Sequence, residues 1–339
     1  MKQDLIWTYF IQLGNNMWRE PDSLVEGRGP LITQATGRYR ETMYTDRKVW
    51  RDVIDFLPSC GFNAVIVDVG EGMQYESYPE LAIPGAWSKE EIRAEVVRMR
   101  AMGLEPIPKL NFSSYHDAWL REYARMKGTA KYYEVVRELI DEVCEVFAPV
   151  KYFHIGMDEE DVPNHKKSFT IIRSNDMWYH DLYFYMECVE KHGARPWVWG
   201  DYYRAHKDTF AQKMPKECIV TEACYERVPK LGTSTQNFYR GYQSLIEISK
   251  MGYDQVPCAS TWACHQNMAQ TIKFYFDQCV VDEHLLGFMS VPWQFTDEVS
   301  RYVLMDDAYR TKYAKELFDL LIFQKNSSII HGKLKKNLL

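Results

Sequence analysis

The sequence predicts a single α/β domain folded as a (β/α)8 TIM barrel, for three reasons. Strand-like and helical patterns alternate along all 339 residues, and the eight predicted strands are the number that closes a barrel. Residues 63–69 form a continuous apolar run, which is typical of a strand covered on both faces. No Gly-x-Gly-x-x-Gly motif follows the first strand, which disfavours the alternative of an open doubly wound sheet.

The first half of the chain contains four predicted strands. Ser88 suits a helix N-cap, and Gly103 follows the helical pattern that begins at Lys89. Pro106 and Pro108 are unusual in a central strand because proline has no N–H to donate. We expect strands at 5–13, 63–69, 104–112 and 152–157, and helices at 47–60, 89–102 and 132–147.

The second half continues the alternation. We expect strands at 195–200, 218–223, 256–261 and 285–292, and helices at 177–192, 244–251, 268–280 and 309–323. No linker, internal repeat or low-complexity run interrupts the pattern. The sequence therefore predicts one barrel domain over residues 1–325, with a long loop at about 14–46 and a C-terminal tail at 326–339.

Composition restricts the class of function. The formal net charge of −6 and the pI of about 5.9 disfavour a nucleic-acid-binding surface. No apolar run approaches the roughly 20 residues of a membrane-spanning helix. No signal-peptide pattern opens the sequence, so we expect a cytoplasmic protein, or a secreted or periplasmic one if a leader has been removed.

Cysteine and aromatic content add two expectations. The eight cysteines form no Cys-x-x-Cys pair and most lie in apolar patterns, so we expect buried thiols in a reducing compartment. Aromatic residues make up 14% of the chain and include 10 tryptophans. Much of this content must form core, but an excess of tryptophan also suits carbohydrate binding, because flat rings stack on the apolar faces of sugars.

Residues 152–160, YFHIGMDEE, carry the strongest functional signal. A short apolar strand ends near Gly156 and is followed by Asp158, Glu159 and Glu160. Because successive strand side chains point to opposite faces, adjacent carboxylates converge only where the strand ends and the backbone turns. In a parallel barrel this end carries the active site, and paired carboxylates are what glycosidic bond cleavage needs. An acidic helix N-terminus is the structural alternative.

Polar and aromatic side chains follow every predicted strand. Tryptophans after strands five, seven and eight, around a pair of carboxylates, favour a sugar-binding platform over three separate core residues. The candidate catalytic residues are Asp158 and Glu159, and the candidate substrate-binding residues are Arg19, His116, His154, Trp199, Asp201, Tyr225, Trp262 and Trp293.

A metal site is the competing chemistry. His116, His154, Asp158 and His165 have atoms suited to zinc or iron. Metal-dependent hydrolases usually carry His-x-His after strand one or a His-Glu-x-x-His motif, and this chain has neither, so we expect no metal and no cofactor. His154 lies on the same strand face as Asp158 and is expected to orient a carboxylate by hydrogen bonding. The absence of a Gly-x-Ser-x-Gly motif and of a phosphate loop disfavours acyl and phosphoryl transfer.

Two groups of motifs resemble glycoside hydrolase family 20, the β-N-acetylhexosaminidases. The family's His-x-Gly-Gly-Asp-Glu signature is similar to HIGMDE at 154–159. The family's course from strand two to strand three is similar to YPEL at 78–81, GA at 85–86, SKEEIR at 88–93 and GLEPIP at 103–108. His116 falls near the family's strand-three histidine, and Trp199 and Trp293 fall near its sugar-stacking tryptophans. The resemblance covers roughly residues 5–300.

This resemblance implies an exo-acting β-N-acetylhexosaminidase with substrate-assisted retaining catalysis, in which the substrate's own 2-acetamido oxygen attacks the anomeric carbon. Glu159 would be the general acid and base. Asp158 would hold the acetamido N–H and stabilise the positive charge that develops on that group. The implied partner is a carbohydrate, the terminal hexosamine of a glycan or oligosaccharide, rather than nucleic acid or membrane.

The chain departs from the family pattern at several positions. Met157 replaces the second Gly of the signature, and the family's Pro-Glu-Ile-Asp is PKLN at 108–111. Gln294 stands where the family's Trp-x-Glu has its Glu, and Trp262 stands where a Tyr grips the acetamido oxygen. We also expect a divergent member that lacks the N-terminal α/β domain common in the family. A glycosidase for a sugar without an acetamido group and a non-catalytic carbohydrate-binding barrel are therefore the alternatives.

Overall fold

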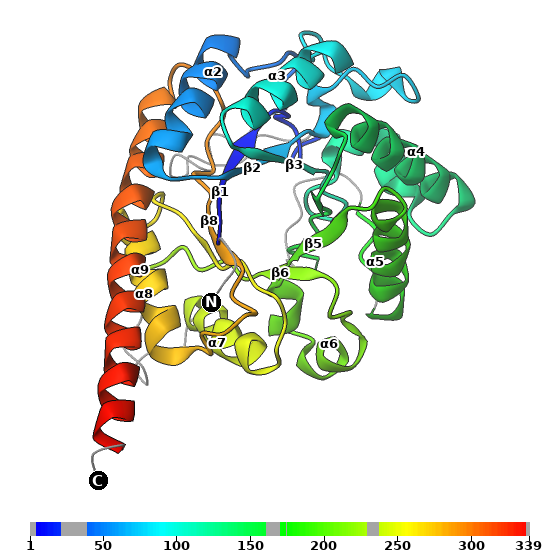
Figure 1. Ribbon diagram of the computed structural model, residues 1–339. Coiled ribbons are helices and arrows are strands. Elements are labelled where there is room, and N and C mark those ends of the chain that lie inside the picture. The colour runs from blue at the N-terminus through cyan, green and yellow to red at the C-terminus, as the bar shows by residue number, and fades with distance from the viewer. Residues whose placement is uncertain (1–4, 22–38, 161–169, 174, 229–236, 337–339) are drawn as a thin grey trace.

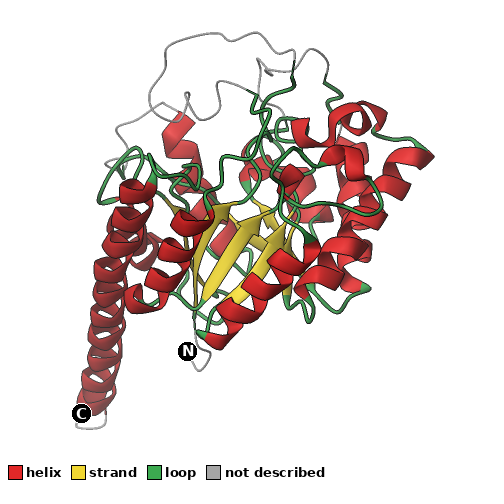
Figure 2. Ribbon diagram, turned by 90° about the horizontal axis from the view of Figure 1, so that it is seen from above, coloured by secondary structure: helices red, strands yellow, loops and turns green. Residues whose placement is uncertain are grey.

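The computed structural model describes residues 5–21, 39–160, 170–173, 175–228 and 237–336. Eight parallel strands form one sheet in the order β6-β5-β4-β3-β2-β1-β8-β7, and helices surround it (Figure 1, Figure 2). Backbone bridges from Val220 to Gln255 and from Ala223 to Cys258 join the two end strands of this order. The predicted (β/α)8 barrel is therefore confirmed.

The elements follow the predicted order. The strands are β1 (Ile6–Gln12), β2 (Ala64–Asp68), β3 (Glu105–Lys109), β4 (Tyr152–His154), β5 (Arg195–Trp199), β6 (Ile219–Thr221), β7 (Cys258–Ala259) and β8 (Gly287–Ser290). The α-helices are α2 (Arg47–Phe56), α3 (Lys89–Ala101), α4 (Ala130–Phe147), α5 (Asn175–Glu190), α6 (Lys207–Lys213), α7 (Asn237–Lys250), α8 (Asn267–Gln278) and α9 (Arg301–Lys336). The helix α6, which is only seven residues long, was not predicted from the sequence.

Local signals in the sequence explain where three helices begin. Asp46 caps α2 by accepting hydrogen bonds from two backbone N–H groups in its first turn. Ser88 and Glu91 form a capping box at the start of α3, and Thr129 caps α4. These side chains satisfy donors that have no partner inside the helix.

The two prolines of β3 are tolerated because of the side of the strand they face. Glu105 donates its N–H to Asn63 O on the β2 side, and Lys109 O accepts from Val69 N on the same side. Because backbone groups alternate between the two neighbours, Pro106 and Pro108 face β4. There the two strands pair only from Lys109 onward, so no ladder hydrogen bond is lost to proline.

The inside of the barrel is packed with side chains. Phe10, Ile66, Ile107, Trp197 and Met289 belong to one buried cluster contributed by five strands. Closed packing of this kind leaves the ends of the strands as the places for a binding site.

The described ends of the predicted long loop are tied to each other. Asn15 Oδ1 accepts from Tyr44 N at 2.8 Å, and Asn16 hydrogen-bonds both backbone groups of Arg40, at 2.7 and 2.8 Å. Residues 22–38 of that loop lie outside the described part of the chain.

The last helix is anchored by a buried carboxylate. Asp307 of α9 accepts hydrogen bonds from Thr261 Oγ1 at 2.6 Å, from Thr261 N at 3.1 Å and from Ser290 Oγ at 2.5 Å. α9 begins before the predicted helix at 309–323 and continues through most of the expected tail, and it lies beside α8 along the barrel (Figure 1). The contacts of Asp307 tie α9 to the carboxyl ends of β7 and β8.

Candidate active site

The chain after β4 makes a tight left-handed turn that brings two neighbouring carboxylates to one place. Gly156, Met157 and Glu159 have φ values of +74°, +71° and +49°. This region costs a residue other than glycine roughly 1–2 kcal/mol, so surrounding contacts must hold Met157 and Glu159 in place. A Cβ on Gly156 would lie 2.0 Å from Asn111 Oδ1, which explains why glycine is required there.

His116 binds both carboxylates that follow this turn. Its Nδ1 lies 3.1 Å from Asp158 Oδ1 and its Nε2 lies 3.3 Å from Glu159 Oε2. Burial disfavours a charged imidazole, but the two negative neighbours outweigh burial and raise the pKa of His116 to about 9. The side chain is therefore an imidazolium at neutral pH and donates from both nitrogens. The Glu159 side chain remains 44% exposed and reaches the open mouth of the barrel.

Asp158 is ionised although it is buried. Asn111 Nδ2 donates to Asp158 Oδ1 at 2.9 Å. Burial alone would raise the pKa of Asp158, but the positive charges of His116 and then Lys109, with the Asn111 hydrogen bond, hold it well below its usual range. Lys109 is itself buried and paired with Asp68 at 2.8 Å. A positive charge inside the barrel thus lies close enough to Asp158 to stabilise its carboxylate.

The third acidic residue points away from this pair. Glu160 accepts from Arg173 Nη2 at 2.8 Å and from Ser114 N at 3.0 Å. Burial opposes ionisation, but Arg173 lowers the pKa of Glu160 to about 2. Arg173 also pairs with Asp181 at 3.1 Å, which ties the chain after β4 to α5. Glu160 therefore holds the loop in place and is directed away from the barrel mouth.

Asp201 contacts the turn from β5. Its Oδ2 accepts the backbone N–H of Glu159 at 2.7 Å, and its Oδ1 is buried without a hydrogen-bond partner among the described residues. Burial, followed by the charge of Asp158, raises the pKa of Asp201 to about 8. Three residues on, Arg204 pairs with the buried Glu222 and donates to Ala223 O at 2.8 Å.

Aromatic rings surround the barrel mouth and meet at Trp293. Its ring centroid lies 6.1 Å from that of Trp18, 6.1 Å from that of Trp199 and 6.2 Å from that of Tyr225. Trp262 is 39% exposed and lies 6.1 Å from Tyr225 at the outer edge. The partly exposed rings of Tyr225, Trp262 and Trp293 can stack against a sugar, whereas Trp18 and Trp199 are buried and pack against Trp293.

Two predicted residues lie differently from the others. His154 is fully buried, and its Nδ1 accepts the N–H of Gly156 at 3.1 Å. Burial lowers the pKa of His154 well below its usual value, so it is neutral, and it supports the turn from below. The expectation that His154 orients a carboxylate by hydrogen bonding was wrong, because His116 has that place. Arg19 is buried. It lies close enough to Tyr115, the neighbour of His116, for its positive charge to oppose the rise in the pKa of Tyr115 that burial causes.

Sequence reasoning did not select several residues of the site. Asn111 and Trp18 are among the polar and aromatic residues that follow predicted strands three and one, but they were not chosen as candidate site residues. A lysine inside an apolar strand is an unusual pattern, and Lys109 could have been found by it. His165, considered as a metal ligand, lies outside the described residues.

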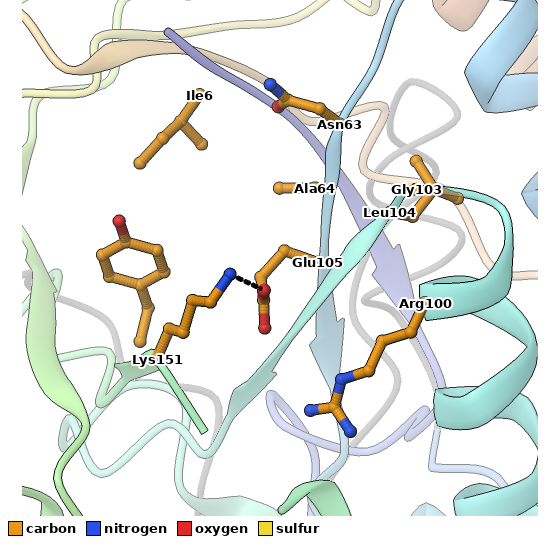
Figure 3. Close-up of a pocket in the computed structure, with 9 residues that line it drawn as sticks. Ile6, Asn63, Ala64, Arg100, Gly103, Leu104, Glu105 and Lys151 are labelled. Carbon is orange, nitrogen blue, oxygen red and sulfur yellow. Dashed lines mark ion pairs between the residues drawn. The ribbon is translucent and has the colours of Figure 1, made fainter. Parts of the chain in front are cut away.

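Other features of the described residues offer no competing site. A pocket at the opposite, N-terminal end of the barrel contains Glu105 and Lys151, which pair with each other at 2.7 Å (Figure 3). Arg100, also in this pocket, donates to three backbone carbonyls at the end of α4. Within the described ranges no group of three or more His, Cys, Asp and Glu side chains is placed to hold a metal ion. None of the helices described is both long and apolar enough to cross a membrane.

Comparison with known sequences gives one family match. The model of the glycosyl hydrolase family 20 catalytic domain matches residues 66–273. No curated protein matches the chain significantly.

Solved structures with a similar fold include three relevant proteins. A chitobiase from Flavobacterium johnsoniae has a TM-score of 0.55 and 18% identity, covering 84% of this chain and 50% of its own. A β-N-acetylhexosaminidase from Bacteroides fragilis has a TM-score of 0.60 and 13% identity, with coverages of 95% and 71%. Dispersin B has a TM-score of 0.55 and 16% identity, with coverages of 80% and 95%. The chain thus spans about half the length of the chitobiase, and at these identities the similarity concerns the fold.

The contact between Gly156 and Asn111 leads to a stability prediction. Gly156→Ala should lower the free energy of unfolding by about 3 kcal/mol or more, because the new Cβ must displace Asn111 and the turn it supports. Gly103→Ala is the matched control, since Gly103 also has a positive φ of +78° but has nothing within 4 Å of a Cβ. Its cost should be only about 1 kcal/mol of backbone strain. Urea denaturation measures both, and equal losses would contradict the packing argument.

The charges of the site predict how stability depends on pH. Burial raises the pKa of Glu71 to about 7, and the pKa values of Asp201 and His116 are raised to about 8 and about 9. Each group contributes stability below its unfolded pKa, about 4 for the carboxyls and about 6.5 for histidine, and this contribution is lost as pH rises through the folded value. The free energy of unfolding should therefore fall as pH rises from about 4 to 9, and the lowered pKa values of Asp158 and Glu160 should make it fall below about pH 4 as well.

His116→Gln tests the contribution of the histidine. The variant should lose roughly 1–3 kcal/mol of the decline between about pH 6.5 and 9, while the part of the decline that is due to Glu71 and Asp201 persists. Urea denaturation at a series of pH values measures the slope. An unchanged slope above pH 6.5 would show that His116 is not charged between the two carboxylates.

Proposed function

This chain belongs to glycosyl hydrolase family 20, and from that premise we propose that it is an exo-acting β-N-acetylhexosaminidase that uses substrate-assisted retaining catalysis. The single observation that carries the proposal is the placement of Asp158 and Glu159 on the two nitrogens of His116, at 3.1 and 3.3 Å. One charged imidazole thereby holds the buried Asp158 and the partly exposed Glu159 side by side. Both lie at the end of the barrel where the aromatic rings gather.

Asp158 has the properties required of the group that assists the substrate. The acetamido oxygen attacks the anomeric carbon, the bond to the leaving oxygen breaks, and the acetamido group becomes a positively charged oxazolinium ion. A carboxylate that accepts the acetamido N–H stabilises this charge only if it is ionised. The charges of His116 and Lys109 lower the pKa of Asp158, so its carboxyl group stays ionised although it is buried away from solvent.

Glu159 is placed for the proton transfers. Its partly exposed carboxyl group donates a proton to the leaving oxygen and later accepts one from the water that opens the oxazolinium ring at the anomeric carbon. The His116 contact at Oε2 fixes the orientation of the group. Because a proton moves efficiently only between atoms within hydrogen-bond reach, this orientation decides how well Glu159 serves the reaction.

The aromatic rings supply the binding surface for a terminal sugar. We assign Trp293 and the Trp199 ring next to it to the sugar that is cleaved, because the N–H of Trp199 donates at 3.0 Å to the carbonyl of Gly156, in the turn that carries the carboxylates. Trp262 at the edge is assigned to the rest of the glycan. Gln294, beside Trp293, takes the place of the family's usual Glu, so recognition of the sugar hydroxyls differs there from the family pattern.

Replacement of the acid and base tests the mechanism. Glu159→Gln should lower kcat/KM on an alkyl β-N-acetylglucosaminide by about 10²–10⁴, because the amide cannot donate a proton to the leaving group. Steady-state kinetics measures the loss. Glu160→Gln is not a suitable control, because Glu160 pairs with Arg173. The exposed Glu134 on α4 is suitable, and Glu134→Gln should leave turnover unchanged. Full turnover in Glu159→Gln would exclude the assignment.

A panel of aryl glycosides tests the sugar. Cleavage should require the 2-acetamido group, and a thiazoline analogue of the oxazoline intermediate should inhibit by occupying the place next to Asp158. Equal cleavage of 2-hydroxy and 2-acetamido glycosides, with no inhibition by the thiazoline, would instead support a glycosidase for another sugar. Binding of glycosides without hydrolysis of any member of the panel would support a carbohydrate-binding barrel.

A further inference from the structure

The backbone of Glu159 is held by a residue that follows β5, although neither Asp158 nor Glu159 belongs to that strand. Glu159 has a φ of +49°, a conformation that a residue with a side chain rarely adopts. The His116 contact fixes one carboxylate oxygen, but it does not fix the peptide from which the side chain projects. That peptide donates its N–H to Asp201 Oδ2 at 2.7 Å. The hydrogen bond joins the turn after β4 to the turn after β5.

Asp201 is well fixed for this role. Gly200 N donates to Thr221 O at 2.7 Å, and a Cβ on Gly200 would meet Val220 Cγ1 at 2.8 Å, so the backbone before Asp201 lies tightly against β6. Arg204, at the end of the 3-10 turn Asp201–Arg204, is tied to Glu222 and Ala223 O, the two residues that follow β6. The carboxyl group of Asp201 thus comes from a rigid element.

We propose that Asp201 is a positioning residue that holds the acid and base Glu159 in its working orientation, an inference that rests on the proposed function. From the sequence, Asp201 was expected to bind the sugar. The two roles differ in consequence. A sugar ligand contributes to binding whatever the leaving group is. A residue that positions the proton donor matters only when the leaving group needs a proton.

The leaving group therefore provides the test. Cleavage of an alkyl glycoside requires protonation of a basic oxygen, whereas a 2,4-dinitrophenyl group leaves without it. kcat/KM reports the steps up to the breaking of this bond, before Glu159 acts as a base. We compare methyl and 2,4-dinitrophenyl β-N-acetylglucosaminide in the wild-type protein and in Asp201→Ala, Asp201→Asn and Asp201→Glu.

The expected pattern has three parts. Asp201→Ala should lose about 10–100-fold in kcat/KM on the methyl glycoside and less than about twofold on the dinitrophenyl glycoside. Asp201→Asn keeps a side-chain oxygen that accepts the Glu159 N–H, so it should stay within about threefold of wild type on both. Asp201→Glu displaces the acceptor by one methylene. It should lose less kcat/KM than Asp201→Ala, again more on the methyl than on the dinitrophenyl glycoside. This variant provides the test if Asp201→Ala does not fold.

Asp208→Ala is the matched control, because Asp208 is exposed on the neighbouring α6, and it should not change either rate. Equal losses of Asp201→Ala on both glycosides, or no loss on either, would overturn the positioning role. Failure of Asp201→Asn to restore the methyl glycoside would overturn it as well. A wild-type protein that cleaves neither glycoside would overturn the proposed function, a result distinct from an active wild type with an unselective Asp201→Ala.

Discussion

The charged imidazole of His116 is the interaction on which the rest of the site depends. Two carboxylates on adjacent residues repel each other, and burial adds a desolvation cost to the ionised form of Asp158. A neutral histidine could satisfy only one of them as a donor. The imidazolium satisfies both, and its positive charge offsets their repulsion. The same carboxylates in turn keep His116 charged, and the charge of His116 keeps Asp158 ionised.

Neighbouring strands each supply one part of the support that this cluster needs. β3 leads to Asn111 and carries Lys109, which bind or stabilise Asp158 from below. β5 leads to Asp201, which holds the Glu159 backbone. Their contacts meet at the left-handed turn after β4, where strain in the backbone is balanced by contacts from both sides. A change in any one of these supports should therefore alter the position or the ionisation of the carboxylates.

The departures from the family pattern acquire a physical meaning in this arrangement. Lys109 stands where the family has a Glu, and it places a buried positive charge, paired with Asp68, near Asp158. Asn111 stands where the family has an Asp, and it donates to Asp158 where another carboxylate would repel it. Both changes favour the ionised form of Asp158. The turn, the carboxylates and their histidine remain compatible with family chemistry even though these two neighbours differ.

Periodicity and strand-end signals in the sequence by themselves determined the barrel, because a strand buried on both faces and a helix with one apolar stripe have different patterns that neighbouring residues reveal. The carboxylates at 158 and 159 could also be predicted, since they follow a strand directly. The partners of these groups could not. Three contacts depend on which strands are neighbours, on their register and on the φ values of one turn. His116 rather than His154 contacts the carboxylates, Lys109 lies near Asp158, and Asp201 holds Glu159. Tertiary structure alone decided these contacts, because they join residues some 40 positions apart in the chain, and local preferences carry no information about such distances.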